Sequence, residues 1–260
     1  MSIRTASLTA LLTLSGLGLA ASTASAQAVY FGVETDAQTL GYVGCYSSSS
    51  YLPSSTFVSS VADPAATTIN SPYYGSMLAD VGASAEARQP ELHARAVGHT
   101  ENVSATPGFY SAPSYGYGYA HSFDRLTVKS DTLAKGTSVT IVFGNQVDLN
   151  TWTYSGLYDG YIDMTLQIGS GTAHSRWSAS YLYGVTTSEA PQITVKTTVG
   201  SQFSVDGKLR AQGRVFYMDG RAAGGDIQAD ATARIVVRDI PAGVTLQSES
   251  GTVYPVVPAN

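Results

Sequence analysis

Strict alternation of apolar and polar side chains is the feature that most constrains the fold of this chain. The longest alternating run places apolar side chains at every second position, at Ile227, Ala229, Ala231, Ala233, Ile235 and Val237. Successive side chains of an extended strand point to opposite faces, so such a run has one buried face and one solvated face. Shorter runs with the same period begin at Leu92, Val139, Ile162 and Ile193. Together with the lack of helical spacing, they predict an all-β protein, an antiparallel two-sheet sandwich of jelly-roll type.

Asp-Gly pairs, which suit turns because glycine adopts positive φ at little cost, are expected at strand ends. They occur at 159–160, 206–207 and 219–220. At the second pair, a three-residue loop over Val205, Asp206 and Gly207 would set Phe203 opposite Leu209 and so keep apolar with apolar. We therefore predict a hairpin there.

The first 26 residues have the features of a secretory signal peptide. Arg4 precedes an apolar run over 8–20, which is followed by Ala24, Ser25 and Ala26. This order predicts cleavage after Ala26 and a secreted or periplasmic protein that begins at Gln27. The apolar run is shorter than a bilayer-spanning helix, and no later segment supplies one, so we expect no transmembrane span.

The net charge and the cysteine content limit the partners and the cross-links that this chain can have. The chain has 14 Lys and Arg against 19 Asp and Glu, a net charge of -5, so nucleic acid is not an expected partner. Cys45 is the one cysteine, which leaves no intrachain disulfide. We expect residues 27–260 to form a single β-sandwich domain, with a loop-rich segment at about 46–83 where Ser, Ala, Thr and Tyr dominate.

Two stretches resemble a known group of proteins. Residues 120–143, AHSFDRLTVKSDTLAKGTSVTIVF, and residues 231–254, ATARIVVRDIPAGVTLQSESGTVY, are similar to exported β-sandwich proteins of Gram-negative bacteria, many of which end in a PEP-CTERM sorting tail. The resemblance implies the fold and export, and it implies no activity. This chain ends in VVPAN, without the hydrophobic helix and basic end of such a tail. Membrane sorting by that route is therefore not expected.

Motifs for catalysis are missing from the sequence. It contains no G-x-S-x-G nucleophile elbow, no phosphate-binding loop and no pair of histidines at metal-ligand spacing. A glycosidase needs two opposed carboxyl groups, but the glutamates are scattered and match no compact motif. We predict no catalytic residues and no cofactor.

The densest group of residues with binding chemistry is DLNTWTYSGLYDGYID, residues 148–163. Its aromatic and acidic side chains form a candidate glycan site, namely Trp152, Tyr154, Tyr158, Tyr161, Asp159 and Asp163. Flat rings pack against apolar sugar faces while carboxylates accept from hydroxyls. The same oxygens could hold Ca²⁺, although the spacing matches no calcium loop. The alternative is an aromatic hairpin tip with Asp at turn positions.

A second aromatic candidate is SYGYGYAHSFDRLTVKS, residues 114–130, in which Tyr115, Tyr117 and Tyr119 would share one face of a strand. Either the rings form a sugar-stacking platform or they pack inside the sandwich. The apolar phase changes from odd to even positions between Phe123 and Leu126, which predicts a bulge or bend near Asp124 and favours packing.

These observations lead to a secreted, non-catalytic surface or extracellular-matrix protein, with a polysaccharide or cell-surface glycan as the expected ligand. The alternative function is a polysaccharide-active enzyme, a lyase or glycoside hydrolase, on a jelly-roll scaffold. A cleft that gathers His or Glu with Tyr and Arg would favour the enzyme, and a flat face of exposed rings would favour binding.

Overall fold

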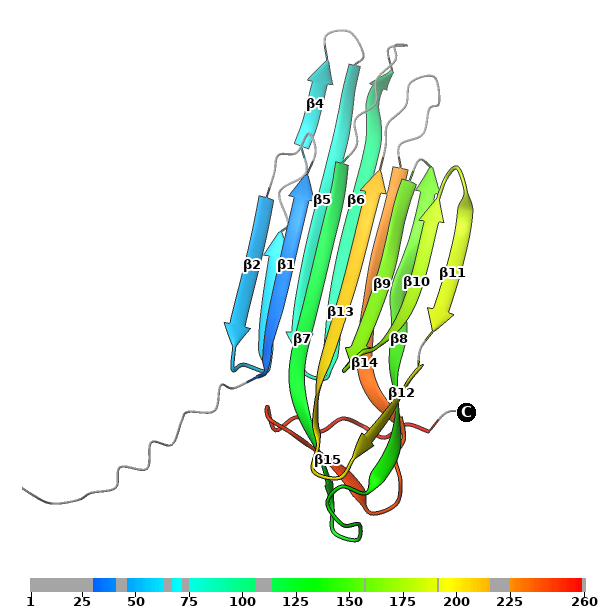
Figure 1. Cartoon of the computed structure of the whole chain (residues 1–260). Helices are drawn as coiled ribbons and strands as arrows, with labels where there is room; N and C mark the ends of the chain where they lie inside the picture. Colours follow the sequence, from blue (N-terminus) through cyan, green and yellow to red (C-terminus); the bar gives the residue numbers. More distant parts are fainter. Residues whose placement is uncertain are drawn as a thin grey trace, which may run out of the picture.

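The protein is a two-sheet antiparallel β-sandwich (Figure 1). The computed structural model describes residues 30–40, 46–62, 67–71, 75–105, 114–156, 158–190, 192–215 and 225–258. These residues form strands β1 to β15 and no helix, and every pairing between the strands is antiparallel. The all-β sandwich expected from the alternation is confirmed, while its jelly-roll connectivity stays a prediction.

The first sheet has its longest strands at its centre. In spatial order it contains β11 (Gly184–Ala190), β10 (Gly171–Ser180), β9 (Tyr158–Ile168), β13 (Gln202–Val215), β7 (Ser114–Ser130), β1 (Gly32–Leu40) and β2 (Tyr46–Pro53). The short strand β15 (Val244–Ser248) pairs with one end of β7. Consequently β7 and β13 lie side by side over fourteen paired positions.

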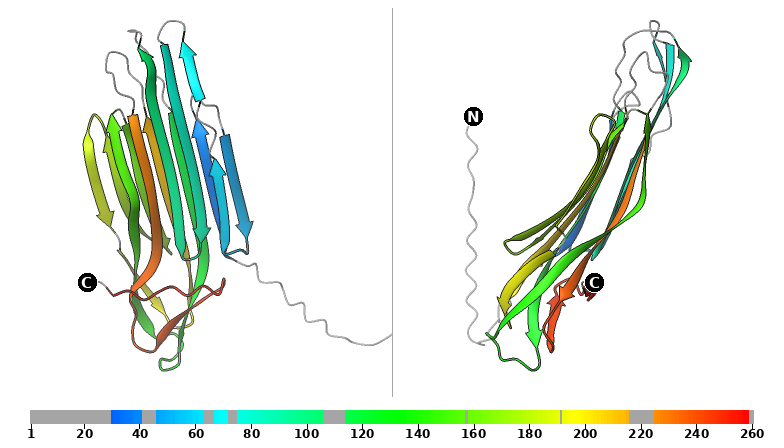
Figure 2. Two further views of the ribbon diagram at one scale, coloured as in Figure 1. Left: turned by 180° about the vertical axis from the view of Figure 1, so that it is seen from behind. Right: turned by 90° about the vertical axis from the view of Figure 1, so that its right-hand side faces the viewer.

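The second sheet packs face to face on the first, and the edge-on view in Figure 2 shows the two layers. Its order is β12 (Gln192–Thr198), β8 (Ser138–Gly156), β14 (Gly225–Asp239), β6 (Glu91–Ala105), β5 (Gly75–Arg88) and β3 (Phe57–Ala62), and β4 (Thr67–Ser71) also pairs with β5. The core between the sheets is formed by the apolar positions of the alternating runs. All six apolar positions of the 227–237 run, on β14, are at most 2% exposed.

Strand β7 keeps one phase along its whole length, so the predicted bend near Asp124 is wrong. Its inward positions are Gly116, Gly118, Ala120 and Ser122, then Asp124 and two apolar residues, and its register with β13 has no shift. The sheets approach so closely here that a Cβ on Gly118 would lie 2.5 Å from the Ser84 carbonyl oxygen. Small residues therefore take the inward positions, and the tyrosines between them point outward.

The predicted hairpin at 205–207 is also wrong, because β13 continues through it. Gly207 faces inward, and a Cβ there would lie 2.7 Å from Cδ1 of Ile235. Likewise Gly160 lies within β9. These two Asp-Gly pairs place glycine where the opposite sheet is close, whereas the third pair lies outside the described residues.

The segment 46–83 contains more strand than its composition suggested. It includes β2, β3, β4 and the first part of β5, so the interpretation as loop-rich needs correction. The predicted signal peptide and Cys45 lie outside the described residues. In the part of the chain that the structure describes, no helix is long and apolar enough to cross a membrane.

The two stretches that carry the resemblance meet at a buried carboxylate. Asp124, which is 0% exposed, accepts hydrogen bonds from the hydroxyls of Ser248 (2.6 Å), Ser250 (2.7 Å) and Tyr254 (3.1 Å). The pKa of the Tyr254 phenol is raised well above its ordinary value by burial and by this carboxylate. A fully buried carboxylate is tolerated only when donors surround it, so these motifs hold the C-terminal segment on the end of β7.

Candidate functional site: the outer face of the first sheet

The six residues predicted within 148–163 do not form one site. Trp152 and Tyr154 lie on β8, opposite the inward residues Ala229 and Ile227, and Tyr158 begins β9. Their rings form a row, with centroids 6.2 Å apart for Trp152 and Tyr154 and 4.7 Å apart for Tyr154 and Tyr158. Trp152 packs against the core. These rings lie at the end of β8 in the second sheet and the start of β9 in the first, and since β8 and β9 do not pair, the alternative of an aromatic hairpin tip is wrong.

The other three residues, Asp159, Tyr161 and Asp163, point to the outer face of the first sheet. The Arg176 guanidinium stacks over the Tyr161 ring at 4.7 Å. The carboxylate of Asp163 is 2.9 Å from Nε2 of His174 and 4.0 Å from Arg176. Asp163 thus already has partners on the neighbouring strand β10, and Tyr161 is the ring that this group contributes to the outer face, with the Arg176 guanidinium over one of its sides.

Strand β13 joins Tyr161 to the three tyrosines of β7. In the register of the sheet, Gln212 stands between Tyr161 and Tyr117. Two residues before and two residues after Gln212 on β13, Arg210 lies opposite Tyr119 and Arg214 lies opposite Tyr115. We call the seven outward residues of these rows the tyrosine face: Tyr115, Tyr117, Tyr119, Tyr161, Arg210, Gln212 and Arg214.

A shallow depression lies at one end of the tyrosine face. It has a volume of about 440 Å³ and is lined by Gln38, Tyr115, Tyr117, Gln212 and Arg214. Its walls come from β1, β7 and β13, three adjacent strands of one sheet. The depression is therefore lined by two tyrosine rings, two glutamine amides and one guanidinium group.

Burial raises the pKa of Tyr117, Tyr119 and Tyr161. For Tyr119 the main cause is burial and the next is the Glu34 carboxylate, and together they place the phenol pKa far above its ordinary value. Burial also raises the pKa of Tyr117 and of Tyr161, partly opposed in both by the positive charge of Arg210. The phenols of Tyr117, Tyr119 and Tyr161 are therefore protonated at neutral pH, when each can donate a hydrogen bond.

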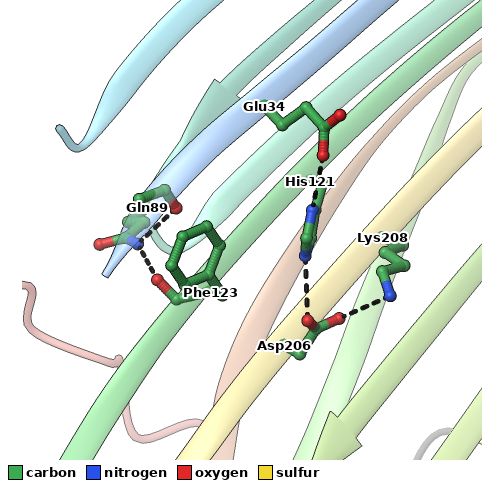
Figure 3. A network of polar contacts seen from close by, with 7 residues as sticks. Glu34, Gln89, His121, Phe123, Asp206 and Lys208 are labelled. Atoms are coloured by element: carbon green, nitrogen blue, oxygen red, sulfur yellow. Dashed lines mark hydrogen bonds and ion pairs between the residues drawn. The ribbon is translucent and has the colours of Figure 1, made fainter. Parts of the chain in front are cut away.

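A chain of charged groups borders the tyrosine face (Figure 3). His121 lies between two carboxylates, with Nδ1 3.2 Å from Glu34 and Nε2 3.0 Å from Asp206, and Lys208 lies 3.3 Å from Asp206. Burial tends to raise the pKa of Asp206, but the hydrogen bond and charge of His121 and the charge of Lys208 outweigh it, so the pKa is lowered. Both ring nitrogens of His121 donate to these carboxylates only when the ring is protonated.

Gln89 holds together the two strands, β1 and β7, that carry Glu34 and His121 of this charged group. Its side-chain amide donates to the carbonyl oxygens of Gly32 (3.2 Å) and Phe123 (2.7 Å), which belong to β1 and β7 (Figure 3). The Thr252 hydroxyl in turn donates to the side-chain oxygen Oε1 of Gln89 at 3.2 Å. The C-terminal segment therefore helps to hold β1 beside β7.

Sequence reasoning missed Arg210, Gln212 and Arg214. Their signal was the alternation of KLRAQGRV over 208–215, which was hidden by the expectation of a turn at Gly207. Among the described residues, no group of three or more His, Cys, Asp or Glu side chains is arranged to hold a metal ion. The suggestion of Ca²⁺ at 148–163 therefore gains no support.

Comparison of the chain with protein-family models, with curated proteins and with solved structures gives no match.

Proposed function

We propose that this protein is a non-catalytic surface or extracellular-matrix protein that binds a glycan on the tyrosine face. The observation that carries the proposal is the row Tyr117, Gln212, Tyr161, in which two outward rings flank an amide on three adjacent strands. Neighbouring strands lie about 4.8 Å apart, so the two rings stand roughly 10 Å apart across the sheet. A sugar chain lying across the strands would meet rings and polar donors in turn.

The chemistry of the face suits sugars. Aromatic rings present flat apolar surfaces for the C–H faces of a sugar, and amide and guanidinium groups hydrogen-bond its hydroxyls. Arg210 is exposed and lies 5.6 Å over the Tyr119 ring, which orients it along the surface. These rings lie on long central strands, which hold a binding surface more rigidly than loops do.

Two features favour binding over the enzymatic alternative. His121 has a carboxylate within hydrogen-bond distance of each ring nitrogen, so both nitrogens already have partners within the protein and neither is directed at a substrate. The raised pKa of Tyr119 also makes its phenolate scarce at neutral pH. Neither His121 nor Tyr119 is therefore an evident general base for a lyase or hydrolase on this face.

Export is part of the proposal and rests on residues 1–26 and on the resemblance to exported sandwich proteins. A secreted or periplasmic location would bring the face into contact with polysaccharides. The low content of charged side chains, 13%, is consistent with a surface built from Ser, Thr, Gln, Asn and Tyr.

A glycan array, followed by calorimetry with the best polysaccharide, tests the proposal. We expect Tyr117→Ala and Tyr161→Ala each to weaken binding by about 1 to 3 kcal/mol, by analogy with the stacking of nucleobases on aromatic rings. Tyr183→Ala is the matched control, because Tyr183 is 85% exposed at the β10–β11 turn, outside the face. A melting curve for each variant separates lost contact from lost folding.

Unchanged binding by a folded Tyr117→Ala/Tyr161→Ala double variant would remove the tyrosine face as the site. Release of new sugar ends from the bound polysaccharide would instead support the enzymatic alternative.

A further inference from the structure

One side of the sandwich exposes the edges of both sheets. On this side β2 is the edge of the first sheet, β3 and β4 are the edge of the second, and β2 contacts β3 (blue and cyan in Figure 1). None of the residues in these three strands is charged, since they read YSSSSYLP, FVSSVA and TTINS. In the described part of the chain, no strand pairs with the outer side of β2.

The opposite side of the sandwich differs in charge. There the edge strands β11 and β12 contain Glu189 and Lys196 respectively. Proteins commonly protect sheet edges with charged residues, because an unprotected edge pairs with other chains. Protection on one side only indicates that the uncharged side has a partner.

The register of β2 shows which backbone groups are available for that partner. The N–H of Ser54 donates to the Phe31 carbonyl, which makes these two residues a hydrogen-bonded pair. Hydrogen-bonded and non-hydrogen-bonded pairs alternate in an antiparallel ladder. Ser47, Ser49 and Tyr51 are therefore in non-hydrogen-bonded pairs with β1, and their N–H and C=O groups point to the open edge.

Apolar side chains are also exposed along this side. Tyr51 (56% exposed) and Leu52 (44%) lie on β2, and Phe57 (43%) and Val61 (61%) lie on β3. They surround the row of four serines at 47–50, whose small side chains allow another strand to approach on either face. The edge thus combines unpaired backbone groups with apolar area that pairing would cover.

We propose that a second copy of this chain binds here, with β2 pairing antiparallel to β2 of the copy about a two-fold axis. An antiparallel edge is complementary to itself under such an axis, so the same residues serve both copies. Serine hydroxyls facing each other across the junction can hydrogen-bond. The absence of charge fits a copy, since any charged residue at the axis would meet its own like charge.

Sedimentation velocity of the purified protein over a hundredfold range of concentration tests the proposal. We expect a species of twice the chain mass. Ser49→Pro removes an N–H that points to the open edge while leaving the β1 hydrogen bonds in place, and proline is tolerated in edge strands. Each copy then loses one hydrogen bond, so the dimer loses two, and we expect the dimer dissociation constant to rise about five- to 150-fold.

A second variant and a control guard against misfolding. Ser47→Lys/Ser49→Lys places like charges across the junction and should give a monomer with an unchanged melting curve. Ser188→Lys puts the same kind of substitution on the exposed face of β11, at the opposite edge, and should leave the dimer intact. A monomeric wild-type protein, a dimer that survives both β2 variants, or a dimer lost with Ser188→Lys would each overturn the proposal. Glycan binding has no bearing on the outcome.

Discussion

The close approach of the two sheets beneath the tyrosine face can be tested by adding one methyl group at Gly118. A Cβ there would lie 2.5 Å from the Ser84 carbonyl oxygen and 2.7 Å from the Arg95 carbonyl oxygen. Ser84 and Arg95 are a matched pair on β5 and β6, so the methyl group would press on two backbones that hold each other. No flexible side chain can move aside.

The expected cost follows from this geometry. Moving the Ser84 oxygen from 2.5 Å to an ordinary contact of 3.4 Å is a shift of about 0.9 Å in the middle of a sheet. Overpacking a core costs about 1 to 3 kcal/mol, and the absence of a yielding side chain puts Gly118→Ala at the upper end. Alanine gives the unfolded chain less conformational entropy than glycine does, which offsets about 0.4 to 1 kcal/mol of this loss. We expect a net loss of about 2 kcal/mol or more in the free energy of unfolding.

Urea denaturation of Gly118→Ala and of a matched control measures the loss. In Gly98→Ala, also an inward glycine in a strand, the nearest atoms to the Cβ would be side-chain methyl groups, those of Val215 at 3.2 and 3.3 Å and Cγ2 of Ile227 at 3.6 Å. These can shift, so the control should stay within about 1 kcal/mol of wild type, with an unchanged dependence on urea in both variants. Equal stability of the two variants would refute backbone contact between the sheets at Gly118.

Two further predictions concern buried and half-buried carboxylates. Asp124→Ala leaves three hydroxyl donors without their acceptor, so it should lower the free energy of unfolding by about 3 to 5 kcal/mol. It should also speed amide hydrogen exchange at Ser250. In the control, Asp131→Ala, the substituted residue is exposed, and the free energy of unfolding should stay within about 0.5 kcal/mol of wild type. Asp206 has a lowered pKa in the folded protein, so its ionised form stabilises the fold above the ordinary value of 3.8, and this contribution is lost as the pH falls through the folded value. Urea denaturation should therefore show a gap between wild type and Asp206→Asn that is wide at neutral pH and narrows in acid, and a gap independent of pH would contradict the pairing with His121.

Which face of each strand is buried could be predicted from the sequence. At Ala231 or Ile162 the information is local, because a strand with one dry face must alternate whatever its partners are. The same local rule failed on β7. Its inward residues Ser122 and Asp124 are polar, and Asp124 accepts hydrogen bonds from a distant segment, for example from Ser248.

The role of each glycine could not be predicted in this way. An Asp-Gly pair suits a turn, and it equally suits a strand that faces a large side chain in the opposite sheet. At Gly207 the deciding neighbour is Ile235, which is 28 residues away in sequence and becomes its neighbour only when the sheets pack.

For the tyrosine face as well, the sequence determined one part and the tertiary structure determined the rest. The sequence by itself determined that Tyr115, Tyr117 and Tyr119 share one side of a strand, because the period of a strand is two residues. Only the tertiary structure decided that this side is the outer one, since the glycines between the rings are the residues that fit against the second sheet. The tertiary structure also decided what surrounds the rings. Tyr161 and Gln212 join them because β13 pairs with β7 on one side and β9 on the other, a register set by long-range hydrogen bonds that no local pattern encodes.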